Sequence, residues 1–191
     1  MIARLVLAAG VLALGACSFG GKPPRTLVSL TSTSQVAAGT QRTAAAGAAL
    51  TVLTPGAVAA VAGTRIPVYS GQGAVAYVKD AAWLEPPARA FQRVVSETVA
   101  ARTGRVVLDP RQTTADPGVR VSGTLQMFGV DAASNQAVVT FDAQRTDAGG
   151  LVTVRRFEAR APVAAIDAVN STAALTDAAN AVAVQVADWL R

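Results

Sequence analysis

The chain has 191 residues, of which 51% are hydrophobic and 15% are charged, so its composition excludes an intrinsically disordered protein. It contains no histidine and a single cysteine, which excludes Ser-His-Asp and Cys-His catalytic sites and removes the usual ligands for zinc, copper or haem. We therefore expect no enzyme activity, no cofactor and no metal.

Residues 1–16 are predicted to be a signal peptide. Arg4 supplies a positive charge, and the uncharged apolar run from Leu5 to Leu14 is too short for a bilayer, which needs roughly 20 apolar residues. Leu14-Gly15-Ala16-Cys17 is similar to the lipobox of bacterial lipoproteins. We therefore expect signal cleavage before Cys17 and attachment of diacylglycerol to its thiol.

The alternative is an ordinary signal peptide that happens to precede a cysteine. We disfavour it because Cys17 is the only cysteine, and a lone thiol in an oxidising compartment would have no partner. Ser18 favours the periplasm-facing outer membrane over the inner membrane. The net charge of +5 could indicate nucleic acid as a partner, but export argues against it. The charge is explained instead by a solvated basic surface, or by attraction to anionic lipid head groups or to an acidic protein.

Beyond the signal peptide we expect a Gly/Pro-rich lipidated tether over residues 17–25 and one domain over residues 26–191. Residues 31–48 are low in information and suit a loop or a weak helix, and residues 55–63 suit a connection. Pro67 suggests an edge strand, because proline cannot donate to a strand ladder. The expected strands of the first half are residues 26–30, 50–53, 65–69 and 74–78.

Helical spacing of apolar residues from Pro86-Pro87 onward predicts a helix that ends at Gly104. A second helix is expected over residues 172–190, with Asn170-Ser171-Thr172 as its cap. Between them, expected strands cover residues 105–108, 119–127, 138–145 and 151–162, and the last three form an antiparallel meander. The pattern predicts an α+β fold: an antiparallel or mixed sheet with the two main helices packed on one face, in a single domain.

The order of these features resembles the ABC-type transport auxiliary lipoprotein family, the PqiC-like lipoproteins. The matching segments are RIPVYSGQGAVAYVKDAAWLEPPARAFQRVV (65–95), VRVSGTLQMFGVD (119–131), the hairpin VVTFDAQRTDAGGLVTVRRFEARAPV (138–163) and the closing Trp189-Leu190 pair. The resemblance covers roughly residues 65–191 and the lipobox, whereas residues 31–63 match poorly.

The resemblance implies a non-enzymatic component of an MCE-type ABC transport system that moves phospholipid or other hydrophobic compounds. The expected partners are the MCE-domain protein of that system and the membrane, reached through the N-terminal lipid, and a homo-oligomer would suit docking to an oligomeric partner. Two alternatives stay open: a periplasmic carrier that holds an acyl chain between helices and sheet, and a structural envelope lipoprotein.

Three residues are candidates for binding. Trp83 could anchor a partner, although packing of the helix start onto the sheet is the favoured interpretation. Arg156 and Arg160 share one strand face with Glu158, which suits contact with lipid head groups or a partner, or simply an exposed sheet edge. Ser70-Gly71-Gln72-Gly73 is interpreted as a turn, because no helix follows it to form a phosphate site.

Overall fold

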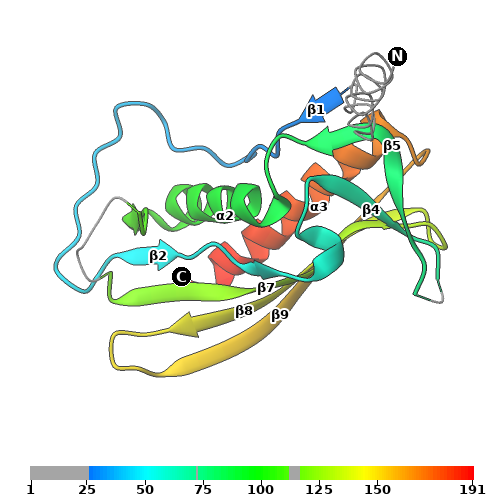
Figure 1. The fold of residues 1–191 in the computed structure, drawn as a ribbon. Helices are drawn as coiled ribbons and strands as arrows, with labels where there is room; N and C mark the ends of the chain where they lie inside the picture. The colour runs from blue at the N-terminus through cyan, green and yellow to red at the C-terminus, as the bar shows by residue number, and fades with distance from the viewer. Residues whose placement is uncertain (1–25, 72, 112–116) are drawn as a thin grey trace, which may run out of the picture.

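The computed structural model describes residues 26–71, 73–111 and 117–191, so the predicted signal peptide, Cys17 and the tether lie outside the described residues. Within these ranges the chain forms one mixed sheet and two long helices, together with one short 3-10 helix (Figure 1). In chain order the elements are β1 (Thr26–Val28), β2 (Leu50–Val52), β3 (Gly56–Ala57), η2 (Ala59–Val61), β4 (Arg65–Tyr69), β5 (Val75–Trp83), α2 (Pro87–Thr103), β6 (Val107–Leu108), β7 (Val119–Asp131), β8 (Gln136–Thr146), β9 (Val152–Pro162) and α3 (Ala168–Trp189).

Strand β7 is the centre of the sheet. One of its edges pairs with β8 in antiparallel register, and β8 pairs in the same way with β9, which confirms the predicted meander. Its other edge pairs in parallel with three short strands in succession, β2, β3 and β4. Outside these lie β6 next to β2, β5 next to β4, and β1 next to β5. The sheet is therefore mixed: β7, β8 and β9 form a long antiparallel half, and the other half joins short strands to β7 in parallel but includes the antiparallel β4–β5 pair.

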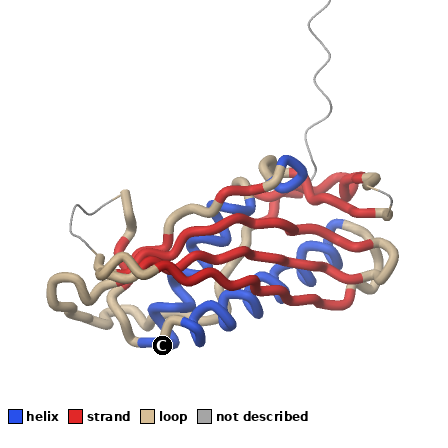
Figure 2. The backbone as a smooth tube through the Cα atoms, turned by 90° about the horizontal axis from the view of Figure 1, so that it is seen from below, coloured by secondary structure: helices blue, strands red, loops and turns tan. Residues whose placement is uncertain are grey.

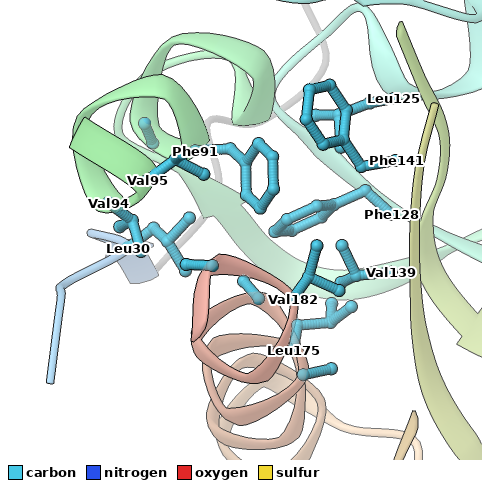
Figure 3. Packing of buried hydrophobic residues seen from close by; sticks show 14 of the residues in the cluster. Leu30, Phe91, Val94, Val95, Leu125, Phe128, Val139, Phe141, Leu175 and Val182 are labelled. Atoms are coloured by element: carbon cyan, nitrogen blue, oxygen red, sulfur yellow. The ribbon is translucent and has the colours of Figure 1, made fainter. Parts of the chain in front are cut away.

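Helices α2 and α3 lie on the same side of the sheet and pack against each other (Figures 1 and 2). Aromatic rings fill the space between the helices and the sheet. Phe91 of α2 meets Phe141 of β8 edge to face, with 5.3 Å between ring centroids, and Phe128 of β7 lies beside them (Figure 3). These contacts confirm the α+β single domain with both helices on one face.

The structure corrects two local predictions. Strand β4 is not at an edge but lies between β5 and β7; Pro67 is tolerated because the β4–β5 register shifts between Arg65 and Pro67. Helix α3 begins four residues earlier than expected, since the Asp167 side chain accepts a hydrogen bond from the backbone N–H of Asn170 (2.8 Å) and caps the helix. Asn170-Ser171-Thr172 is thus the first turn of the helix and not its cap.

Residues 30–34, here called the N-terminal strap, follow β1 and cross over both helices. Leu30 is 2% exposed and packs into the core, while the Ser32 hydroxyl lies 3.2 Å from the hydroxyl of Thr98 on α2. The buried amide of Asn180 on α3 accepts from the Thr33 backbone N–H (2.8 Å) and donates to the Thr31 carbonyl (2.9 Å). A buried amide with these partners fixes the strap to α3, so the start of the domain is tied directly to the helix pair.

Replacing Asn180 with alanine is expected to destabilise the domain by about 1–2 kcal/mol, because the partly buried hydrogen bonds that join the strap to α3 would be lost. Asn170→Ala on the same helix is the control, with an expected change within about 0.5 kcal/mol. Urea unfolding followed by circular dichroism measures both. Equal stabilities of the two variants would contradict the role of the strap.

Candidate functional site

The sheet face turned away from the helices carries a row of charged and polar side chains. Along β9 the residues alternate: Phe157 and Ala161 are buried toward the helices, whereas Arg156, Glu158 and Arg160 are exposed on the other side. The structure thus brings the two predicted arginines together on one face. We call this the outer face; it is made of Gln126, Thr140, Asp142, Arg156, Glu158 and Arg160.

Each arginine of the outer face is paired with a carboxylate. The Arg156 guanidinium donates two hydrogen bonds to Asp142 on β8, from Nε at 2.6 Å and from Nη2 at 2.7 Å. Gln126 of β7 donates a third to the same carboxylate, at 3.0 Å. Arg160 donates to Glu158 at 2.8 Å. The sequence placed the arginines correctly but missed Asp142 and Gln126, because cross-strand neighbours depend on the register of the meander.

These contacts determine the charge state of the outer face. The hydrogen bond from Arg156 lowers the pKa of the Asp142 carboxyl, and this effect outweighs partial burial, which acts the other way. Burial raises the pKa of Glu158, yet the hydrogen bonds from Arg160 and Thr140 together outweigh it and leave that pKa lowered as well. Both carboxylates are therefore ionised and neutralised at neutral pH, which suits surface recognition and not general acid–base chemistry.

Trp83 ends β5 immediately before the loop that leads into α2. The residue is 2% exposed, and its ring meets Phe128 edge to face with 5.6 Å between centroids. Its position joins the start of α2 to the centre of the sheet, so the ring presents no free face to a partner. Trp189 packs in a similar way on Phe157 of β9, with 5.5 Å between centroids.

Exposed apolar side chains gather at the end of the β8–β9 hairpin, next to the outer face. Leu151, Val152 and Val154 are 67%, 51% and 72% exposed. Val152 and Val154 alternate along the strand in step with Arg156, so they lie on the same side of the sheet. We call these three residues the hairpin cluster. Strand alternation in the sequence contains the signal for the two valines, because they follow the same two-residue period as Arg156.

Two kinds of site are absent from the described residues. No group of three or more His, Cys, Asp or Glu side chains that could hold a metal ion occurs in residues 26–71, 73–111 and 117–191. Within the same ranges, no helix is both long and apolar enough to cross a membrane.

Asp142→Asn is expected to lower the free energy of unfolding by about 0.5 kcal/mol at pH 7, as is typical of an exposed ion pair. The pKa of Asp142 is lower in the folded state than in the unfolded state. The stabilisation from its ion pair is therefore complete at pH values above the unfolded-state pKa, and it is lost as the pH falls through the folded-state pKa. Urea unfolding between pH 7 and pH 2 measures it. In a protein that already carries Arg156→Gln, Asp142→Asn should change the free energy of unfolding very little. If the effects of the two substitutions simply add in the double variant, the pairing of Asp142 with Arg156 is contradicted.

Comparisons with known proteins agree with this architecture. The crystal structure of a protein from Xanthomonas campestris superposes with a TM-score of 0.69 at 18% identity, covering 86% of this chain and 94% of the other. That of an uncharacterised protein also gives a TM-score of 0.69, at 10% identity, covering 86% of this chain and 97% of the other. At these identities the likeness establishes the fold alone. No curated protein matches the sequence.

Family membership rests on the sequence itself. Residues 29–187 match the family described as the ABC-type transport auxiliary lipoprotein component, so the match spans almost the whole described domain. Such a family is a class of membrane-anchored envelope proteins that serve transport, and it is not a class of enzymes. This agrees with the resemblance noted in the sequence. The chain therefore belongs to the family of ABC-type transport auxiliary lipoprotein components.

Proposed function

We propose that this protein is the lipid-anchored, non-enzymatic auxiliary component of an MCE-type ABC transport system that moves phospholipid or other hydrophobic compounds across the envelope. In this role it docks the partner MCE-domain protein at the outer membrane. The match to the transport auxiliary family over residues 29–187 carries the proposal. The lipobox at Cys17, followed by Ser18, supports anchoring on the periplasmic side of the outer membrane.

The geometry of the domain suits a protein held at one end. Strand β1 begins at Thr26, nine residues after Cys17, and an extended chain of that length reaches at most about 30 Å. The N-terminal end of α3 lies beside β1, and the 22-residue helix runs from there for about 33 Å. The C-terminal end of α3 then packs on β9 through Trp189 and Phe157. The hairpin cluster is therefore far from the anchored end (Figure 1).

A partner that approaches from the inner membrane meets the end farthest from the anchor first. That end carries the hairpin cluster beside the charged outer face, and interfaces commonly combine an apolar centre with a polar rim. We place the docking surface for the MCE-domain protein there, with Val152 and Val154 at its centre and Arg156 at its rim.

The carrier alternative finds less support. It needs room for an acyl chain between the helices and the sheet, yet Phe91, Phe128 and Phe141 fill that layer (Figure 3).

A genetic experiment distinguishes the proposed transport role from the alternative of a structural envelope lipoprotein. If the protein serves transport, deleting it and deleting the transporter should give the same permeability defect, and the double deletion should add nothing.

A pull-down tests the docking surface. The full, tagged chain is recovered from detergent-solubilised envelopes, and we expect the neighbouring MCE-domain protein to copurify. Val154→Asp should reduce its recovery about tenfold, because a buried carboxylate at the contact would lose its hydration. Val75→Asp is the control, since Val75 is an exposed valine on β5, outside the hairpin cluster. Recovery of no MCE-domain protein by the unaltered chain would contradict the proposal.

Cys17→Ser tests the anchor. Without the thiol no diacylglycerol can be attached, so the variant should move from the membrane fraction to the soluble periplasmic fraction. Mass spectrometry of the N-terminal peptide checks acylation directly. Because the described fold begins at Thr26, thermal unfolding of the domain should stay unchanged. Membrane retention of the variant at the wild-type level would contradict acyl anchoring.

A further inference from the structure

A surface groove runs between β1 and the first turns of α3, separate from the outer face and from the hairpin cluster. Val28 forms one wall, and Val169, Thr172, Ala173 and Thr176 form the other. Its volume is about 480 Å³, which is within the range of about 300–1,000 Å³ usual for ligand-binding clefts.

The groove is more apolar than its residue types suggest. The Thr172 hydroxyl donates to the backbone carbonyl of Ala168 at 2.7 Å, and the Thr176 hydroxyl donates to that of Thr172 at 2.8 Å. Both hydroxyls are therefore satisfied within α3, which leaves the threonine methyl groups as contact surface. Among the residues that line the groove, Asp177 is the charged one. Such a surface gains free energy by contact with hydrocarbon and offers little to a polar ligand.

One large exposed apolar side chain extends the lining of the groove: Val169, in the first turn of α3, is 75% exposed. Leu27 of β1 is 60% exposed, but it alternates with the groove residues Thr26 and Val28, so its side chain lies on the other side of the strand. Leu84, whose backbone N–H donates to the carbonyl of Val28 at 2.8 Å, is 64% exposed at the same end of the domain. Exposed apolar side chains concentrated at one end of a domain mark a contact with a membrane or a partner.

The position of the proposed lipid anchor at Cys17 favours the bilayer as the surface that contacts the groove. Thr26, at the rim of the groove, is nine residues from Cys17, so an acylated Cys17 holds this surface within about 30 Å of the bilayer. We infer that the groove, with the exposed Val169 side chain in its wall, rests on the anchoring bilayer and takes up lipid hydrocarbon. The inference depends on the proposed acylation of Cys17. It assigns the domain an orientation in which the hairpin cluster points away from the membrane.

Because the acyl chains on Cys17 suffice for lasting attachment, this contact would fix the orientation of the domain on the membrane. It is hydrophobic in character, since Asp177 and the nearby helix cap Asp167 are acidic and would not attract anionic lipid. Burial at the groove should therefore depend little on ionic strength.

Site-directed fluorescence in vesicles tests the orientation. Acylation occupies the single native cysteine, so Val169→Cys introduces one free thiol for a small environment-sensitive dye. The full lipidated chain is reconstituted alone into phosphatidylethanolamine–phosphatidylglycerol vesicles that contain a lipid-borne quencher. Val154→Cys, of similar exposure in the hairpin cluster, is the matched control. Quenching at position 169 should exceed that at position 154 at least threefold and persist at high salt.

Equal quenching at the two positions would overturn the inference. So would shielding of position 169 that appears only when the MCE-domain protein is added, because a protein would then occupy the groove. Mass spectrometry of the same samples separates this failure from failure of the proposed function. If Cys17 is acylated and quenching is equal at the two positions, the lipid anchor is supported and the proposed orientation is contradicted. If Cys17 carries no acyl group, the lipid anchor is contradicted, and so is the inference that depends on it.

Discussion

Hydrogen bonding along both edges of β7 is the constraint on which the rest of the structure depends. Its 13 residues pair with β8 on one side and with β2, β3 and β4 in succession on the other. Gly123 lets β7 and β8 approach closely, since a Cβ atom there would lie 2.1 Å from the Asp142 carbonyl oxygen. Because strands of two to five residues are marginal by themselves, β2, β3 and β4 depend on β7 as the long strand that joins them to the rest of the sheet.

The two faces of this sheet have different roles. The inner face is covered by α2 and α3 and filled by aromatic rings, and the N-terminal strap contacts α2 at Thr98 and α3 at Asn180. No helix of the described residues covers the outer face, whose charges are neutralised in pairs: Arg156 with Asp142 across two strands, and Arg160 with Glu158 along β9. An antiparallel half-sheet can keep one face in water because its residues alternate between apolar and polar.

The long axis adds a second asymmetry that suits a transport auxiliary component. One end holds β1 and the start of α3, and the other holds the turn between β8 and β9 (Figure 1). The apolar groove is therefore at the first end and the hairpin cluster at the second. A lipid at one end and a protein partner at the other would turn the domain into a spacer between membrane and transporter. Neither role needs a reactive side chain, which agrees with a chain that lacks histidine and pairs its outer-face carboxylates with arginine.

The sequence by itself determined the features that are local or periodic. Helical spacing identified both helices, alternation identified the long strands, and the placement of Arg156 and Arg160 on one face followed from the two-residue period of β9. Only the tertiary structure decided what depends on contacts between distant residues. The parallel pairings of the short strands, the position of β4 inside the sheet, the strap held by Asn180 and the Asp142–Arg156 pair all depend on sheet register and on docking of the helices. The groove joins β1 to α3, elements more than a hundred residues apart, so no local pattern in the sequence could reveal it.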